Sequence, residues 1–307
     1  MSLTALYDLP APAKLNTFLH VVGRREDGYH LLESAMLLID WCDTLHIKRR
    51  GDRKLRRIDL AAHLPADDLC LRAAQALQRE SGSDQGAEIS IEKRVPAGAG
   101  MGGGSSDAAT TLLALNRLWG LNWSRRRLSI LGLSLGADVP FFLGGSNAFV
   151  QGVGEQLTPL AIAPQWLAVV KPAVNIDTKA VYESPLLRSD TPAVILASLF
   201  ARGDSTSKSN AVSSPSEVFF SGKNDLQQPA MSLSAEIGQS LQWLEEQFGN
   251  ARMTGSGSGV FAWLGSVESA AEVKRSIAAL PESLPLGCMG RMCRSLEQHP
   301  LRGWVSD

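Results

Sequence analysis

Apolar and polar positions follow two different periods along this chain, and both periods occur in each half. Alternating or β-branched runs predict strands at 45–48, 58–60, 87–91, 165–170 and 260–264. Apolar residues recur at helical spacing at 69–80, 125–135, 233–248 and 267–280. No internal repeat or heptad is present. A chain that mixes strands and helices in this way is typical of an α+β protein.

The best-marked helix is expected directly after a cluster of glycines. Ser105 or Ser106 is its predicted N-cap, Asp107 lies in its first turn, and Gly120 ends it. Its apolar stripe consists of Ala108, Leu112, Leu115 and Trp119.

The length of 307 residues predicts two domains, because one domain usually takes about 100–200 residues. The pattern changes after Leu160, so we place the domains at 1–160 and 161–307. Segment 202–217 is rich in serine and has no apolar period, which predicts a mobile loop.

Charge and cysteine content exclude several classes of protein. The 30 basic and 31 acidic residues nearly cancel, which argues against nucleic-acid binding and against an electrostatic membrane anchor. No apolar run approaches the ~18 residues of a membrane-spanning helix, and the first residues lack the pattern of a signal peptide, so we expect neither feature. The four cysteines lack paired spacing, so a disulfide or zinc framework is not expected. We expect a cytoplasmic protein.

Five of the nine residues from Gly98 to Ser106 are glycine, and this run lies between a predicted strand and a predicted helix. Glycines let successive backbone N–H groups converge on an anion, and the helix adds the positive end of its dipole. The run therefore predicts a phosphate-binding loop. A simple flexible turn is the alternative. The Lys-Ser/Thr ending of a Walker A loop is absent.

Four other segments contain candidate site residues, but each pattern by itself also fits an ordinary structural role. Lys14 and Asn16 lie two apart on one face of a predicted buried strand, although a lone lysine is often solvated. Asp138 follows a predicted helix end and precedes a proline, a position that also suits an ordinary turn aspartate. The glycine-rich segment 254–259 could be a turn or a second phosphate nest. Tyr29 and His30 offer a stacking face and a hydrogen-bonding edge.

In their order along the chain, three motifs resemble those of the GHMP kinases. They are Pro-Ala-Lys-Leu-Asn at 12–16, Pro-Ala-Gly-Ala-Gly-Met-Gly-Gly-Gly-Ser-Ser-Asp-Ala at 96–108, and Thr-Gly-Ser-Gly at 254–257. Within that superfamily, Asp-Gly-Tyr-His at 27–30, Gly-Ala-Asp-Val-Pro-Phe-Phe at 136–142, Gly-Val-Gly-Glu at 152–155 and Lys-Asn-Asp-Leu at 223–226 are similar to the kinases of 4-diphosphocytidyl-2-C-methyl-D-erythritol. The resemblance spans residues 12–264.

The resemblance implies a fold, a reaction and a set of residues. The fold would be a two-domain α+β GHMP kinase, with an N-terminal domain like domain 2 of ribosomal protein S5 and a ferredoxin-like C-terminal domain. The reaction would transfer a phosphoryl group from ATP to the 2-hydroxyl of the CDP-linked methylerythritol, in the non-mevalonate route to isoprenoid precursors. Asp138 would be the general base, and Lys14 would hold it ionised.

The remaining implied roles are binding roles. Those for ATP fall on Lys93, Pro96, Gly98, Gly100, Gly102, Gly103, Gly104, Ser105 and Ser106. Those for the substrate fall on Asn16, Tyr29, His30, Thr178 and Tyr182, with the two tyrosines on either side of the cytosine. Mg²⁺ is expected from the triphosphate chemistry, without assigned protein ligands.

One departure and two alternatives accompany this hypothesis. Asp68 stands where the resemblance predicts an asparagine near the adenine pocket. Another GHMP kinase, for homoserine or mevalonate, would not need an aromatic clamp for a pyrimidine. A regulator without catalysis would not need both Lys14 and Asp138. We expect small-molecule partners only, and a monomer or homodimer.

Overall fold

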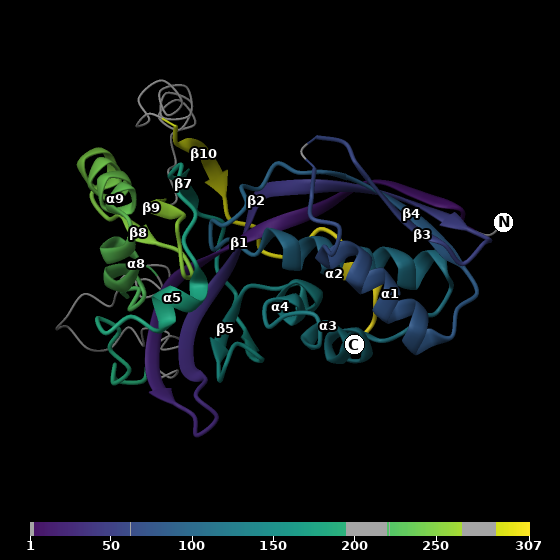
Figure 1. Ribbon diagram of the computed structural model, residues 1–307, viewed down its shortest axis with the longest axis horizontal. Coiled ribbons are helices and arrows are strands. Elements are labelled where there is room, and N and C mark those ends of the chain that lie inside the picture. Colours follow the sequence, from purple (N-terminus) through teal and green to yellow (C-terminus); the bar gives the residue numbers. More distant parts are fainter. Residues whose placement is uncertain (1–2, 62, 195–219, 221, 266–286) are drawn as a thin grey trace, which may run out of the picture.

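The computed structural model describes residues 3–61, 63–194, 220, 222–265 and 287–307. The serine-rich segment 202–217 and the helix predicted at 267–280 therefore lie outside the described residues. Within the described ranges the chain forms two sheets, with helices packed on each (Figure 1).

The first half of the chain forms a six-stranded sheet with the path β3-β4-β2-β5-β6, and β1 pairs with β2. Neighbouring strands are antiparallel except for the parallel pair β3 and β4. The strands are β1 (Ala5–Arg24), β2 (His30–Arg50), β3 (Leu55–Asp59), β4 (Gly86–Glu92), β5 (Ala148–Gln151) and β6 (Gln156–Pro159). The strands predicted at 45–48 and 87–91 lie within β2 and β4, and the one at 58–60 overlaps the end of β3.

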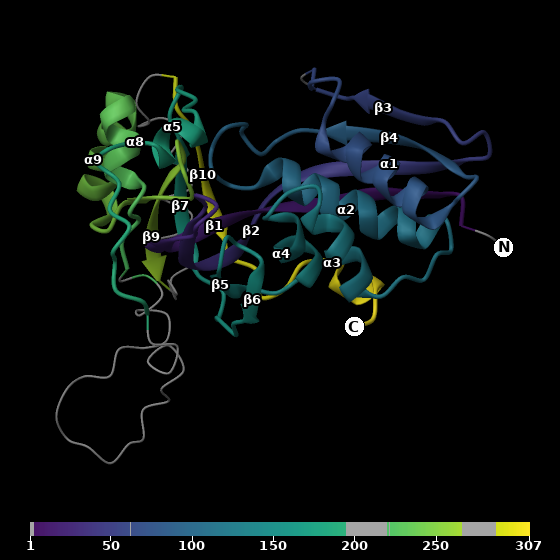
Figure 2. The ribbon, with the colours of Figure 1, turned by 60° about the horizontal axis from the view of Figure 1, so that its bottom comes forward.

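Four helices cover one face of this sheet (Figure 2). They are α1 (Leu69–Ser81), α2 (Gly103–Leu118), α3 (Arg125–Leu133) and α4 (Val139–Gly144). Their apolar faces meet the inward side chains of β2 and β4 in a continuous core, in which Leu38, Leu77 and Leu112 are completely buried. Burial of this apolar surface is the main force that holds the helices on the sheet.

The second half forms a four-stranded antiparallel sheet in the order β10-β7-β9-β8. Its strands are β7 (Trp166–Lys171), β8 (Arg252–Met253), β9 (Val260–Gly265) and β10 (Met289–Arg294). Among its described residues, the helices of this half are α5 (Thr178–Tyr182), α8 (Gln227–Leu233) and α9 (Ala235–Phe248), and a 3₁₀ turn, η1 (Arg302–Trp304), lies near the C-terminus. Apolar residues of α8 and α9 bury against this sheet in a separate cluster.

The two halves are linked at several places. Leu19 of β1 forms a bridge with Asn224, and Ile39 of β2 forms one with Ser295. The C-terminal residues return to the first half, where Arg125 of α3 donates to Asp307 at 2.5 Å, and the C-terminus lies beside α3 (Figure 2). The predicted domain boundary at residue 160 falls between the two sheets and stays a prediction.

The predicted serine cap of the helix after the glycine run was wrong. Helix α2 begins at Gly103, not after a serine cap, and its N-cap is Gly102 in the left-handed conformation with φ of 67°. A glycine can adopt this conformation without a side-chain clash, so the helix starts inside the glycine run. Asp138 follows the end of α3 at Leu133, as predicted. It is the N-cap of α4, and Pro140 lies in the first turn of that helix, where a missing N–H costs nothing.

Two helix ends were also misplaced. The helix predicted at 233–248 is α9, which begins at Ala235, because Ser234 adopts an extended conformation that separates it from α8. The helix predicted at 125–135 ends at Leu133. Gly120 follows the end of α2 with φ of 66°, as predicted.

Candidate active site

The glycine run forms an open loop that leads into the first turn of α2. Gly98, Gly100 and Gly102 all have positive φ, between 63° and 70°. Helix α2 has no side chain that caps its N-terminus. The first hydrogen bond of the helix is donated by Ser106 N to Gly102 O, at 2.9 Å. The N–H groups of the preceding turn have no carbonyl four residues earlier in the helix, so they suit an anion.

The second glycine-rich segment braces this loop. Ser258 N donates to Gly98 O at 3.0 Å, and Gly259 N donates to Ala99 O at 3.1 Å. Gly100 packs so closely that a Cβ there would lie 2.4 Å from the carbonyl oxygen of Thr254. Most N–H groups of segment 254–259 are thus engaged within the protein. This favours a supporting role for the segment over a full second phosphate nest.

Lys14 and Asp138 meet at the end of the loop. Lys14 lies on β1 and is almost completely buried, and its Nζ lies 3.5 Å from Oδ2 of Asp138. The same Nζ donates to Oδ1 of Asn16 at 2.5 Å. A buried ammonium needs such oxygen partners, because desolvation without them is costly. Asp138 keeps 31% of its side chain exposed, so its carboxylate can reach a ligand.

These three residues line a cavity of about 400 Å³ between the two halves of the chain. Its walls also include Gly100, Gly102 and Ser105 of the loop region, Thr178 and Tyr182 of α5, and Ser34 of β2. Thr178 Oγ1 lies 2.8 Å from Ser256 Oγ at this wall. The cavity therefore brings an acidic group, an ammonium and the start of the phosphate loop to one space.

A wider cavity of about 920 Å³ shares Tyr182 with the first and contains Tyr29 and His30. The rings of His30 and Tyr182 stack with centroids 5.3 Å apart and planes 28° from parallel. Burial raises the pKa of Tyr182, and the charge of Asp138 raises it further. Burial lowers the pKa of His30, and Arg24 lowers it further, so the neutral imidazole is favoured. Tyr29 is 65% exposed, so its ring is accessible to a ligand.

A third cavity, of about 280 Å³, lies on the other side of the loop. The predicted nucleotide-binding residues in its wall are Lys93, Pro96, Gly98, Gly100, Gly102, Gly103 and Gly104. Ser105 lines the cavity of Lys14 instead, and Ser106 is completely buried and lines none of the three. Leu64, Leu69 and Val95 give this third cavity apolar walls that suit a flat base.

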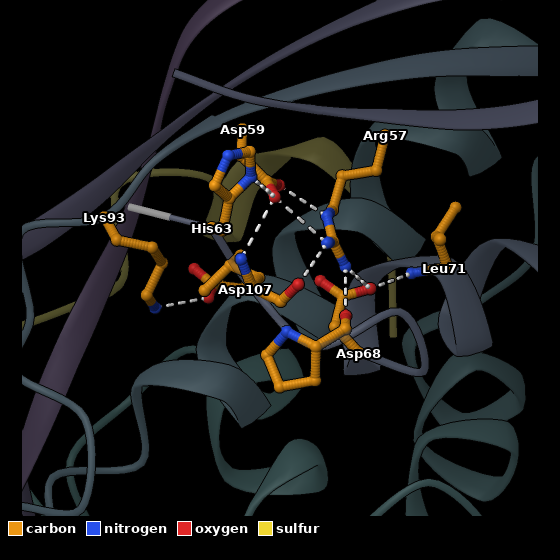
Figure 3. Close-up of polar contacts among 9 residues, drawn as sticks. Arg57, Asp59, His63, Asp68, Leu71, Lys93 and Asp107 are labelled. Atoms are coloured by element: carbon orange, nitrogen blue, oxygen red, sulfur yellow. Dashed lines mark hydrogen bonds and ion pairs between the residues drawn. The ribbon is translucent and has the colours of Figure 1, made fainter. Parts of the chain in front are cut away.

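Lys93 is not a free cation in this cavity. Its Nζ donates to the carboxylate of Asp43. It also donates to Oδ2 of Asp107 at 2.6 Å (Figure 3). Burial alone would lower the pKa of Lys93, but Asp107 and Asp43 outweigh burial and raise it. Burial raises the pKa of Asp107, although the ammonium of Lys93 opposes this. Lys93 therefore secures the start of α2 to β2.

Asp68, the residue that departs from the expected pattern, has two defined partners (Figure 3). Its Oδ1 accepts from Leu71 N at 3.0 Å and so caps α1, and it forms an ion pair with Arg57 at 3.0 Å. Arg57 also donates to Asp59 at 2.6 Å. Asp68 lines the third cavity, so its carboxylate is a charged group at the wall expected to hold adenine.

Sequence reasoning missed Ser34 and Ser256 as residues of the site. Ser34 lies in the middle of an apolar strand and has no motif around it. Ser256 lies within a motif whose serines could serve a turn equally well. Only their contacts with distant segments, Ser34 with Asn16 and Ser256 with Thr178, show that they belong to the site.

Both halves of the chain match families of known proteins. Residues 68–146 match the GHMP kinases N-terminal domain, and residues 198–282 match the GHMP kinases C-terminal domain. The 4-diphosphocytidyl-2-C-methyl-D-erythritol kinase of Methylibium petroleiphilum is 59% identical over 99% of this chain and all of its own length. The protein of the same name from Variovorax paradoxus is 51% identical over 98% of this chain and 99% of its own.

Solved structures agree with these sequence relatives. A crystal structure of 4-(cytidine 5'-diphospho)-2C-methyl-D-erythritol kinase matches with a TM-score of 0.74 and 32% identity, over 92% of this chain and 98% of that chain. A homoserine kinase from Cytophaga hutchinsonii matches with a TM-score of 0.66 but only 15% identity, over 96% of this chain and 95% of that chain, which shows a shared fold.

The sequence-based prediction of the fold and of the family is confirmed by these matches. The chain belongs to the 4-diphosphocytidyl-2-C-methyl-D-erythritol kinase family of the GHMP kinases.

Proposed function

We propose that this protein transfers the γ-phosphoryl group of ATP to the 2-hydroxyl of 4-diphosphocytidyl-2-C-methyl-D-erythritol, in the non-mevalonate route to isoprenoid precursors. Relatives of this name cover almost the whole chain at up to 59% identity. One observation carries the chemical part of the proposal. Asp138 and Lys14 face a cavity that the phosphate loop bounds on one side and Tyr182 on another.

The reaction needs one base and several positive groups. Asp138 accepts the proton of the substrate hydroxyl as its oxygen forms a bond to the γ-phosphorus. The bond between the γ-phosphorus and the β–γ bridging oxygen breaks, and ADP leaves. Lys14 balances the charge of Asp138, and the N–H groups at the start of α2 hold phosphate oxygens.

The wider cavity supports a cytidine-binding role. Tyr29, His30 and Tyr182 supply ring faces and polar ring edges in a space of about 920 Å³. His30 stacks on Tyr182 here, so a cytosine that lies between Tyr29 and Tyr182 requires His30 to turn its edge toward the base. A homoserine or mevalonate kinase has no pyrimidine to hold and no need of these rings.

We propose that Mg²⁺ enters with ATP as part of the substrate. Among the residues that the structure describes, no group of three or more His, Cys, Asp or Glu side chains could hold a metal ion. Magnesium in kinases takes most of its ligands from phosphates and water. The described part of the chain also contains no helix long and apolar enough to cross a membrane.

A substrate comparison tests the proposal. The purified protein, ATP and Mg²⁺ are incubated with the CDP-linked methylerythritol, homoserine or mevalonate, and ADP release is followed. We expect turnover with the first acceptor only, and ³¹P NMR of the product should show a new phosphomonoester on the tertiary 2-hydroxyl. Turnover with homoserine or mevalonate alone would contradict the proposal.

A further inference from the structure

Ser34 lies on β2, outside every motif that the sequence marks, and it is 2% exposed. It pairs with Leu19 of β1 and Val150 of β5, so its backbone is fixed in the middle of the sheet. Its side chain lines the cavity that contains Lys14 and Asp138.

We propose that Ser34 is a positioning residue that orients Asn16 and thereby holds Lys14 against Asp138. Three hydrogen bonds form a chain. Ser34 Oγ donates to Phe18 O at 2.5 Å, Asn16 Nδ2 donates to Ser34 Oγ at 2.7 Å, and Lys14 Nζ donates to Asn16 Oδ1 at 2.5 Å. The ion pair between Lys14 and Asp138 extends the chain to the reacting group.

Only one orientation of the Asn16 amide satisfies all these partners. An ammonium has donors only, so the oxygen of the amide must face Lys14 and its nitrogen must face Ser34. Ser34 has a single proton, which it donates to Phe18 O, so its oxygen is free to accept from the amide. The hydroxyl thus stabilises one of the two amide orientations over the other.

The backbone of Asn16 is held independently of Ser34. Asn16 N donates to Thr254 Oγ1 at 2.8 Å, which ties β1 to the second glycine-rich segment. Loss of the Ser34 hydroxyl would therefore free the amide to rotate without moving the strand. If the nitrogen of the amide turned toward Lys14, two donors would face each other, and the ammonium would move away from its present position.

This inference rests on the proposed function for its kinetic test. Ser34→Thr keeps the hydroxyl, and Ser34→Val has the same shape as threonine but no hydroxyl. A comparison of these two variants therefore isolates the hydrogen bonds of the hydroxyl. Ser34→Ala covers the case in which the added methyl groups disturb folding. Ser240→Val is the matched control, because Ser240 is equally buried but lies on α9, beside Cys288.

We expect Ser34→Val and Ser34→Ala to lower kcat about 10- to 100-fold while KM for both substrates changes less than about threefold, because a displacement near 1 Å at the reacting groups has this effect. Ser34→Thr should retain most of the wild-type kcat, and Ser240→Val all of it. Equal kcat values for the Thr and Val variants, or a loss confined to KM, would overturn the inference.

Crystal structures of the Thr and Val variants separate this inference from the proposed function, because they need no substrate. The Val variant should show Asn16 rotated and Lys14 Nζ withdrawn from Asp138, whereas the Thr variant should keep both in place. Unchanged positions of both side chains in the Val variant would refute the positioning role. A wild-type protein that fails to phosphorylate the CDP-linked acceptor would refute the proposed function alone.

Discussion

Lys14 shows how one residue depends on partners from distant parts of the chain. It is 4% exposed, and its ammonium lies against Asn16 of its own strand and Asp138 of α4. Its Cε also lies within 3.3 Å of the position that a Cβ would take at Gly102. The position of the Lys14 ammonium therefore depends on the Asn16 amide and on the absence of a side chain at Gly102. Each of these residues can be substituted separately.

The first prediction at this scale concerns Asp138. Asp138→Asn keeps the shape of the side chain but removes the base, so kcat should fall about 10²- to 10⁴-fold while KM for the CDP-linked substrate changes little. Steady-state kinetics measure both. The exposed Asp190, which pairs with Arg188, gives the matched control Asp190→Asn, which should have wild-type kcat. Near-normal turnover of Asp138→Asn would remove Asp138 as the base.

The buried imidazole of His299, which is 2% exposed, should make the stability of the protein depend on pH. Its Nδ1 accepts from Leu301 N at 3.1 Å, and its Nε2 is buried without a partner. Burial lowers the pKa of His299 to about 4, and the charge of Arg125 lowers it further. The pKa of His299 in the folded protein lies below its value near 6.5 in the unfolded chain. The contribution of neutral His299 to the free energy of unfolding is therefore fully present above pH 6.5 and is lost as the pH falls toward 4.

The free energy of unfolding should therefore fall by about 2 kcal/mol between pH 7.5 and pH 5 through this group. His299→Gln carries no titrating ring and should lack this part of the pH dependence. Urea unfolding of both proteins at the two pH values gives the difference directly. The same pH dependence in both proteins would show that His299 does not titrate as inferred.

At the scale of elements, the phosphate loop is held by a second loop that follows it by more than 150 residues. Gly98 and Ala99 accept hydrogen bonds from Ser258 and Gly259. Lys14 N donates to Met101 O at 3.0 Å, which fixes the far end of the loop to β1. The loop thus has its shape before ATP arrives, and less conformational entropy is lost on binding.

Gly100→Ala tests this arrangement. The new Cβ would lie 2.4 Å from Thr254 O, on a residue with φ of 70°. We expect a loss of about 1–3 kcal/mol of stability from backbone strain, and a higher KM for ATP because the two loops separate. Thermal unfolding and ATP kinetics measure these effects. Gly51→Ala, where no atom lies within 4 Å, is the control, and equal behaviour of the two variants would contradict the bracing role.

In the molecule as a whole, β1 carries Lys14 and Asn16 of the candidate site and also contacts the second half of the chain. Arg252 of β8 reaches across this junction, where its guanidinium donates to Thr17 O at 2.9 Å, to Gly222 O at 2.6 Å and to Phe220 O. Burial lowers the pKa of Arg252, and Glu245 opposes this. One charged side chain thus satisfies three carbonyls, one on β1 and two in the segment before α8.

Arg252→Met should leave these carbonyls without a donor while it keeps much of the side-chain volume. We expect a loss of about 3 kcal/mol in the free energy of unfolding, because hydrogen bonds from charged donors are strong and buried carbonyls are costly to leave unpaired. Urea unfolding at pH 7.5 measures this loss. The exposed Arg72 gives the control Arg72→Met, which should change stability by less than about 0.5 kcal/mol. Similar stability of both variants would exclude the linking role of Arg252.

Periodicity and glycine spacing are local properties, so the sequence alone predicted the α+β class, most of the described strands and helices, the glycine-rich loop before α2 and the order of the family motifs. It could not locate the start of α2, which needs no side-chain cap when a glycine precedes it. It also did not predict the short helix α5, which carries Thr178 and Tyr182 into the site.

Tertiary structure alone decided which of several possible partners each polar residue has. Lys93 carries the positive charge expected of a phosphate-binding residue, but it pairs with Asp43 and Asp107. The bond between Asn16 and Thr254 joins residues 238 positions apart. A hydrogen bond acts over about 3 Å, so its partner depends on how β1, β2 and the two glycine-rich segments pack, and no local pattern in the sequence records that packing.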